Sequence, residues 1–144
     1  MVNKRIGLAA DHGGFRLKCF VIEQLRETSH EVLDLGTFDE DAVDYPDFAK
    51  KLVAALKKKQ IASGILICGT GIGISIAANR NKEVRAALCH DENTARLSRL
   101  HNDANVLCLG GRTTSKTMAA DIVRIFFETE FEGGRHARRI NKLG

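Results

Sequence analysis

Short apolar runs recur along the chain and constrain its fold more than any other feature of the sequence. They lie at residues 5–10, 31–35, 64–68, 84–89 and 105–109. Each run is nearly continuous in apolar character, instead of alternating with polar residues, which is typical of strands covered on both faces in a parallel sheet. We therefore expect five buried parallel strands.

The segments between these runs repeat apolar residues at every third or fourth position, which is typical of one face of an α-helix. The repeats are Phe15, Cys19, Ile22 and Leu25; Phe48, Leu52, Val53 and Leu56; and Met118, Ile122, Ile125 and Phe126. Pro46, the only proline, is expected in the first turn of the second helix. This alternation predicts an α/β protein, a three-layer α/β/α Rossmann-like sandwich with a five-stranded parallel sheet, in one domain over residues 1–144.

The composition, 44% hydrophobic and 28% charged, is typical of a globular protein. No apolar run approaches the roughly 18 to 20 residues that cross a bilayer, and the stretch Ile6–Ala10 is too short for the core of a signal peptide. We expect a cytoplasmic protein without a membrane partner. The four cysteines form no C-x-x-C pair, which favours free thiols over a zinc ribbon or a disulfide framework.

The excess of basic over acidic residues, which gives the net charge of +4, lies near the C-terminal end of the sequence. Residues 135–142 hold four basic side chains and no acid, so basic and acidic groups balance over the rest of the sequence. A basic tail on a neutral body can bind a nucleic acid or a small anion, or it can be a solvated charged terminus.

Ligands of parallel α/β sheets bind beyond the carboxyl ends of the strands, so the residues that follow each predicted strand are candidates for the site. These residues are polar or rich in glycine. They are residues 11–14, 36–37, 69–73, 90–91 and 110–112.

The loop at residues 69–73 has glycine at alternate positions and precedes a helix expected to start near Ile74. Successive backbone N–H groups in such a loop can hold an oxyanion or a phosphate. It is not a Walker A loop, because no Gly-Lys-Ser/Thr follows, and Ile74 stands where a dinucleotide fingerprint has its third glycine. Asp91, about 20 residues on, keeps a dinucleotide site open as an alternative, and so does a turn that merely packs a helix on a strand.

Cys68 ends the third predicted strand directly before that loop. A nearby helix N-terminus favours the thiolate, so Cys68 can be a base or a nucleophile. The alternative is a small buried hydrophobic residue, as Cys89 and Cys108 at similar strand positions illustrate.

Two further groups of side chains can carry chemistry. His101, on a short polar helix, is either a proton donor and acceptor or a residue that caps the helix end. Arg135 and Arg139 share one face of a predicted helical turn, a spacing that suits bidentate contacts with a phosphate.

Taken together, these motifs resemble the RpiB/LacAB family of sugar-phosphate isomerases. The resemblance rests on residues 11–15 (DHGGF), 44–46 (DYP), 64–73 (GILICGTGIG), 97–103 (LSRLHND) and 132–136 (EGGRH). It implies an aldose-ketose isomerase of the pentose phosphate pathway that converts ribose 5-phosphate to ribulose 5-phosphate through an enediolate, with neither a metal nor an organic cofactor.

The resemblance also implies catalytic roles. Cys68 matches the base that moves a proton between C1 and C2; relatives that use a glutamate carry it near the position of Ser75. His101 matches the residue that opens the furanose ring, with Asp11 as a polar partner. The loop that holds the enediolate matches Gly69, Thr70, Gly71, Ile72 and Gly73.

Other positions match substrate contacts. Asn102 corresponds to a sugar-hydroxyl contact, and Tyr45 lines the site. The phosphate-binding group corresponds to His12, Arg112, Arg135 and Arg139.

The resemblance further implies a homodimer, or a tetramer built from it, with the active site shared between subunits. Allose 6-phosphate and galactose 6-phosphate are alternative substrates in the same family. A nucleotide or nucleic-acid binding module is the alternative outside enzymes, but with one Tyr and no Trp the chain offers little for base stacking, so no nucleic-acid partner is expected.

Overall fold

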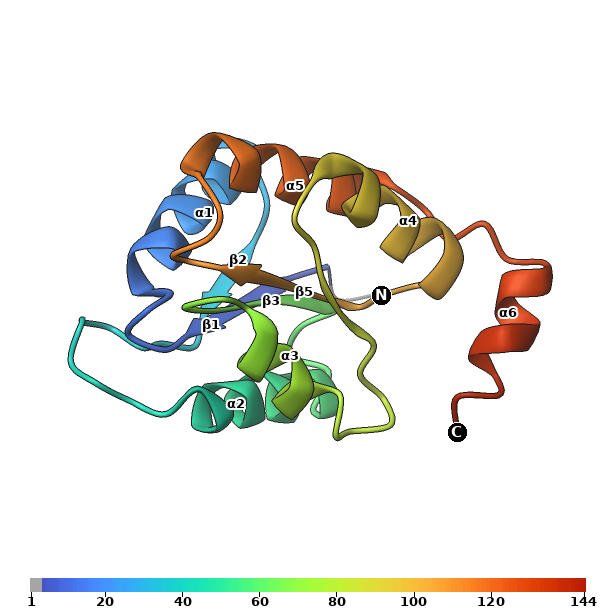
Figure 1. Cartoon of the computed structure of the whole chain (residues 1–144), viewed down its shortest axis with the longest axis horizontal. Helices are drawn as coiled ribbons and strands as arrows, with labels where there is room; N and C mark the ends of the chain where they lie inside the picture. The colour runs from blue at the N-terminus through green and yellow to red at the C-terminus, as the bar shows by residue number, and fades with distance from the viewer. Residues whose placement is uncertain (1–3) are drawn as a thin grey trace.

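The computed structural model describes residues 4–144, and these form five strands and six helices (Figure 1). The strands are β1 (Ile6–Ala10), β2 (Val32–Asp34), β3 (Ser63–Cys68), β4 (Ala86–Leu88) and β5 (Val106–Gly110). The helices are α1 (Phe15–Glu27), α2 (Tyr45–Lys57), α3 (Ile72–Ala78), α4 (Glu92–Asn102), α5 (Lys116–Glu128) and α6 (Arg135–Ile140).

All five strands pair in parallel in the order β2-β1-β3-β5-β4, which confirms the predicted parallel sheet. The three central strands have nearly the predicted bounds. The edge strands β2 and β4 are shorter than predicted, with three residues each. An edge strand is paired along one side only, and both ladders end after three residue pairs.

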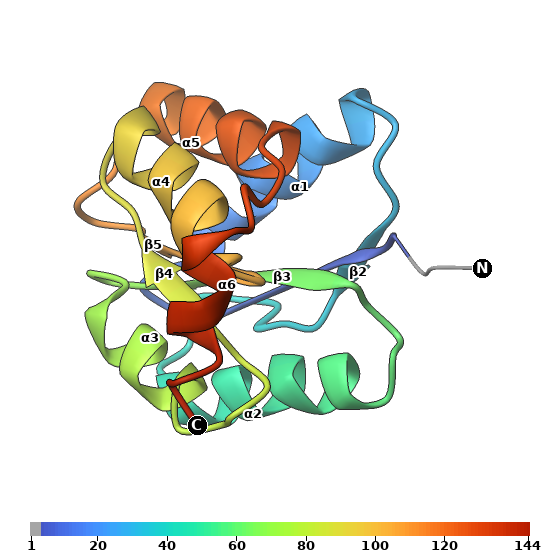
Figure 2. The same ribbon diagram turned by 90° about the vertical axis from the view of Figure 1, so that its right-hand side faces the viewer.

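Helices cover both faces of the sheet, as predicted (Figures 1 and 2). α1, α4 and α5 form one layer, and α2 and α3 form the other. Right-handed crossovers explain the assignment, because connections that run toward β2 and those that run toward β4 must cross opposite faces. In the strand order, β1 and β3 are therefore neighbours whose following helices lie on opposite sides.

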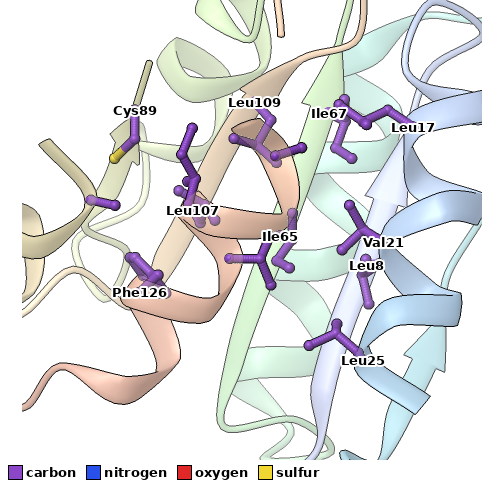
Figure 3. Close-up of a cluster of buried hydrophobic side chains, with 14 of the residues drawn as sticks. Leu8, Leu17, Val21, Leu25, Ile65, Ile67, Cys89, Leu107, Leu109 and Phe126 are labelled. Atoms are coloured by element: carbon purple, nitrogen blue, oxygen red, sulfur yellow. The ribbon is translucent and has the colours of Figure 1, made fainter. Parts of the chain in front are cut away.

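Two apolar cores, one on each face, explain why the strands read as continuous apolar runs. Leu8, Ile65 and Leu107 face α1 and α5 (Figure 3). The alternate residues face α2 and α3, and Cys68 and Cys108 are among them. Successive strand residues point to opposite faces, so both sets must be apolar where both faces are covered.

Local signals place the helix starts. Pro46 stands in the first turn of α2, as predicted. α3 begins at Ile72, earlier than the predicted start near Ile74, because Gly71 adopts φ 78° and ends the preceding turn. Within residues 4–144, none of the helices is long and apolar enough to cross a membrane.

Candidate active site

Three turns meet at the carboxyl edge of the sheet, where β1, β3 and β5 end. The N–H of Asp11 donates to the carbonyl of Ile67 (3.2 Å), and the N–H of Gly111 donates to the carbonyl of Cys68 (2.8 Å). A Cβ on Gly111 would lie 2.2 Å from the carbonyl oxygen of Gly13, so only glycine allows the turns to approach this closely. The hydrogen bonds fix the three turns as one rigid surface.

Cys68 lies at the centre of this surface. Its side chain is buried, and the N–H of Gly71 donates to its Sγ over 3.1 Å. The left-handed conformation of Gly71 turns this N–H back toward the sulfur, a conformation that L side chains rarely adopt. A backbone donor stabilises a thiolate, so the geometry suits Cys68 to act as a base.

Two further thiols, those of Cys89 and Cys108, are also buried. Burial raises the pKa of Cys108 far above its ordinary value, and burial also raises the pKa of Cys89. Both therefore behave as small apolar residues, as the sequence comparison of the three cysteines suggests. All four cysteines are free thiols, as predicted.

The hydroxyl of Thr70 is available to a ligand. Its Oγ1 accepts a hydrogen bond from the N–H of Ile72 (3.2 Å), which leaves the hydroxyl proton for another acceptor. Thr70 itself is exposed. The segment from Cys68 to Gly73 therefore holds a thiol, a hydroxyl and backbone N–H groups within a few residues.

Acidic and basic side chains surround the turn. The carboxylate of Asp11 is buried and accepts a hydrogen bond from the N–H of Gly14 (3.1 Å). Nδ1 of His12 accepts a hydrogen bond from the N–H of Val43 (3.2 Å), so a neutral ring carries its proton on Nε2. This proton is then available to an anion.

Two larger side chains lie against glycines of the turn. The guanidinium of Arg112 lies over Gly69, with an Nη atom 2.9 Å from the place where a Cβ would stand. The ring of Tyr45 lies over Gly73 in the same way, with Cζ 2.7 Å from that place. Gly69 and Gly73 therefore make room for these side chains, and both predicted contact residues belong to the Cys68 surface.

The remaining predicted site residues lie at the opposite edge of the sheet. His101 and Asn102 form the last turn of α4, and Asp103 caps the helix in a left-handed conformation. The carbonyl of Asn102 accepts a hydrogen bond from Nε of Arg85 (2.9 Å), directly before β4 begins. This end of α4 is therefore tied to the amino ends of the strands.

Arg135 and Arg139 lie on α6, beside the same end of α4 (Figure 2). The predicted helical turn is confirmed, and both arginines are exposed. A cavity of about 280 Å³ lies between the two helices. Its lining residues are His101, Asn102, His136, Arg139, Ile140 and Leu143.

The predicted site residues thus lie in two groups, at opposite edges of the sheet in one chain (Figure 1). The N–H of Gly64 donates to Asn105 at the amino end of β3, and Cys68 lies four residues further along that strand. Four residues of a strand span about 13 Å. General acid-base catalysis needs heavy atoms within about 3 Å, so His101 cannot assist Cys68 or pair with Asp11 within one chain.

His136 was missed as a site residue by the sequence interpretation, although it lies within one of the recognised motifs. Its side chain is 5% exposed and stacks on the His101 ring, with 4.2 Å between ring centroids and 14° between planes. The sequence did offer one signal for His136: it directly follows Arg135 in a predicted helical turn that also carries Arg138 and Arg139.

His101, Glu132 and His136 bring possible metal ligands within 4.8 Å of one another. A metal ion lies close to the plane of each imidazole that binds it, and Zn–N bonds are about 2.0 to 2.1 Å long. The nearly parallel rings confine their nitrogen lone pairs to two separate, nearly parallel planes. This arrangement does not converge on one ion, so the geometry gives no support to a metal site here.

Known proteins share both the sequence and the fold of this chain. Residues 6–143 match the family described as Ribose/Galactose Isomerase. Ribose-5-phosphate isomerase B of Escherichia coli is 42% identical over 140 residues, which cover 97% of this chain and 94% of that protein.

Solved structures give the same result. Ribose-5-phosphate isomerase B of Clostridium thermocellum superposes with a TM-score of 0.96 at 48% identity, covering 97% of this chain and 95% of that one. The enzyme of Thermotoga maritima superposes with a TM-score of 0.95 at 50% identity, covering 96% of each chain. The resemblance drawn from the motifs is confirmed: this chain is an enzyme of the ribose/galactose isomerase family.

Proposed function

We propose that this enzyme interconverts ribose 5-phosphate and ribulose 5-phosphate through an enediolate, with Cys68 as the base. The hydrogen bond from the N–H of Gly71 to Sγ of Cys68 carries the proposal, because it joins the base to a turn rich in N–H donors. A proton on carbon beside a carbonyl is removable only if the developing oxyanion is stabilised, and preorganised donors do this best. The names of the E. coli, C. thermocellum and T. maritima relatives support this substrate.

The proposed reaction begins from the open-chain sugar. The Cys68 thiolate takes the proton from C2, the electron pair of that C–H bond forms the C1=C2 double bond, and the π pair of the C1 carbonyl moves onto O1. The thiol then delivers a proton to C1, either the one it took or one exchanged with solvent, while a hydroxyl proton passes from O2 to O1. The Thr70 hydroxyl, whose oxygen already accepts from Ile72, is oriented to donate to one of these oxygens.

A homodimer with shared sites would complete the catalytic set. The distance between the two edges of the sheet supports this, because His101 cannot reach Cys68 in the same chain. We assign ring opening to His101 of the partner subunit, which protonates the ring oxygen. Asp11, buried at the Cys68 end, is the carboxylate next to which this histidine would stand.

Arginines and a histidine would hold the phosphate. His12 and Arg112 come from the subunit that supplies Cys68, and Arg135 and Arg139 come from the partner subunit. Guanidinium groups bind a phosphate bidentately. The phosphate is remote from the reacting carbons, so these contacts supply binding energy that keeps the sugar in register.

A six-carbon sugar phosphate is the second candidate substrate, because the matching family is described by galactose as well as ribose. The same base and turn would serve galactose 6-phosphate or allose 6-phosphate. One extra carbon lengthens the distance between the phosphate and the reacting carbons. The preferred substrate therefore indicates how far the phosphate-binding groups lie from Cys68.

The test is an isomerase assay with ribose 5-phosphate, allose 6-phosphate and galactose 6-phosphate, without added metal or cofactor. We expect ribose 5-phosphate to react fastest. In Cys68→Ala we expect kcat to fall by about 10³, since general acid-base catalysis contributes about 10² to 10⁴. Cys108→Ala, a buried thiol facing the same core, is the matched control and should keep its kcat.

Thermal unfolding of both variants shows whether the fold is retained. Full activity in a folded Cys68→Ala protein would remove the cysteine mechanism. If either hexose phosphate reacted faster than ribose 5-phosphate, that hexose phosphate would replace it as the proposed substrate.

A further inference from the structure

His136 has an environment that its own hydrogen bonds do not explain. It stands in the first turn of α6, is buried, and stacks face to face on His101. Among the described residues, its Nε2 is the buried side-chain nitrogen or oxygen atom without a hydrogen-bond partner. The nearest carboxylate oxygen, on Glu132, is 3.9 Å away, which is too far for a hydrogen bond.

A buried polar atom without a partner costs free energy, so an apolar side chain would fill this space at lower cost. Within the described chain, the position of the His136 ring is therefore not set by a hydrogen bond to its Nε2. The contact that remains is the ring face it presents to His101, at 4.2 Å between centroids.

The stack is anchored on both sides. The N–H of Glu132 donates to the carbonyl of Leu100 (3.1 Å), and Nε of Arg99 donates to the carbonyl of Thr129 (3.1 Å). These bonds tie the segment before α6 to the last turns of α4. The His136 ring therefore has a fixed place relative to the helix that carries His101.

The charge of the His136 ring is also constrained by its surroundings. Burial lowers the pKa of His136, and the positive charges of His101, Arg135 and Arg139 lower it further, while Glu132 alone opposes them. His136 is therefore neutral at neutral pH. A proton on His101 then faces a neutral ring instead of a second positive charge.

We infer that His136 is a positioning residue for His101: the stacked face of its ring fixes the orientation of the His101 imidazole. The inference rests on the proposed function, in which His101 opens the sugar ring. A misplacement of about 1 Å in a catalytic group can lower the rate by about 10². Loss of the ring that fixes His101 should therefore have a measurable effect on the rate.

Two reactions separate His101 from Cys68. Opening the furanose needs a proton on the ring oxygen, cleavage of the C1–O bond, and loss of the proton on the C1 hydroxyl. Ribulose 5-phosphate cannot form a furanose, because its 5-oxygen carries the phosphate. Exchange of its C1 hydrogen with deuterium from solvent therefore needs the base and the enediolate-holding turn, but no ring opening.

The experiment measures both reactions in the full-length enzyme: conversion of ribose 5-phosphate, and deuterium incorporation at C1 of ribulose 5-phosphate by NMR. We expect His136→Ala to slow conversion by about 10- to 100-fold and to change exchange by less than about threefold. His136→Phe keeps a neutral ring and should convert ribose 5-phosphate several-fold faster than His136→Ala. His101→Asn should show the same selectivity, with a larger loss of conversion.

His30→Ala is the matched control, because His30 contacts the ring of Phe127 loosely, with 6.2 Å between centroids, and has no place in the site. It should leave both rates unchanged. Normal conversion by His136→Ala would overturn the inference. So would an equal fall of both rates, which indicates lost substrate binding or a lost fold, or a Phe variant no better than Ala. A wild-type enzyme that performs neither reaction would instead remove the proposed function, and this inference with it.

Discussion

The two edges of the sheet carry different parts of the candidate site. One edge offers mainly backbone groups, and the other offers mainly side chains. At the Cys68 edge, short turns from three central strands are joined by backbone hydrogen bonds, and the donors are largely backbone N–H groups. At the α6 edge, two helices present side chains, two imidazoles and a set of arginines. Cys68 and Asp11 at the first edge are buried, whereas Arg135 and Arg139 at the second are exposed.

This difference suits the two tasks of a sugar-phosphate isomerase. Stabilising a developing oxyanion needs donors that are already oriented, which a turn held by three strands supplies. Binding a dianion and moving a proton need groups that carry charge, which helix side chains supply. In the proposed mechanism neither edge is sufficient alone, so we predict that edges of two different subunits work together.

Complementation between inactive variants should give the largest effect. Cys68→Ala damages one edge and His101→Asn the other, so a mixed dimer contains one intact site and one doubly damaged site. We expect each parent to be about 10² to 10³ slower than the wild type and the mixed dimer to recover roughly half of the wild-type rate. Co-expression with two different affinity tags isolates the mixed dimer for the assay.

The control mixes Cys68→Ala with Asp11→Asn. Both changes lie at the same edge, so each site of that mixed dimer is damaged and no recovery is expected. Recovery in this control, or its absence in the first pair, would contradict a site shared between opposite edges.

The sequence was sufficient to predict the layers of the fold. Continuous apolar runs can satisfy two covered faces only in a central parallel strand, and β1, β3 and β5 have nearly the predicted bounds. The edge strands were less predictable, since the apolar residues of 84–89 extend beyond the three residues of β4 that pair with β5. Pairing on one side is a property of the sheet order, which the local pattern does not contain.

The residues of the candidate site were named from the sequence, and the resemblance implied a site shared between subunits, but the separation of these residues within one chain came from the structure. Cys68 and the following turn are adjacent in sequence, so local reasoning brought them together correctly. His101 required one more step: a helix that follows a parallel strand returns along the sheet, so its last turn lies at the amino edge. His136 stayed hidden because its contact with His101 joins two helices that are far apart in the sequence.

Removal of the α6 arginines should have an intermediate effect. We expect Arg135→Ala and Arg139→Ala each to raise KM for ribose 5-phosphate by about 10- to 100-fold, with a smaller change in kcat, because hydrogen bonds to charged groups contribute about 1.5 to 3 kcal/mol. Arg138→Ala, the third arginine of α6, is the control and should leave KM unchanged. Steady-state kinetics at fixed ionic strength measure all three variants. Unchanged kinetics in both Arg135→Ala and Arg139→Ala would show that α6 is a solvated basic terminus and not a phosphate-binding group.

The smallest expected effect is a pH dependence of stability that belongs to the α6 edge. Burial first, and then neighbouring positive charges, hold the pKa of His136 below its ordinary value. The unfolded chain takes up a proton near pH 6.5 and the folded chain only at lower pH, so acidification through this range favours unfolding. His136→Phe removes the titrating group and should lose less stability than the wild type between pH 7.5 and pH 5.5, measured as the urea midpoint. An equal loss in both proteins would show that His136 is not held neutral.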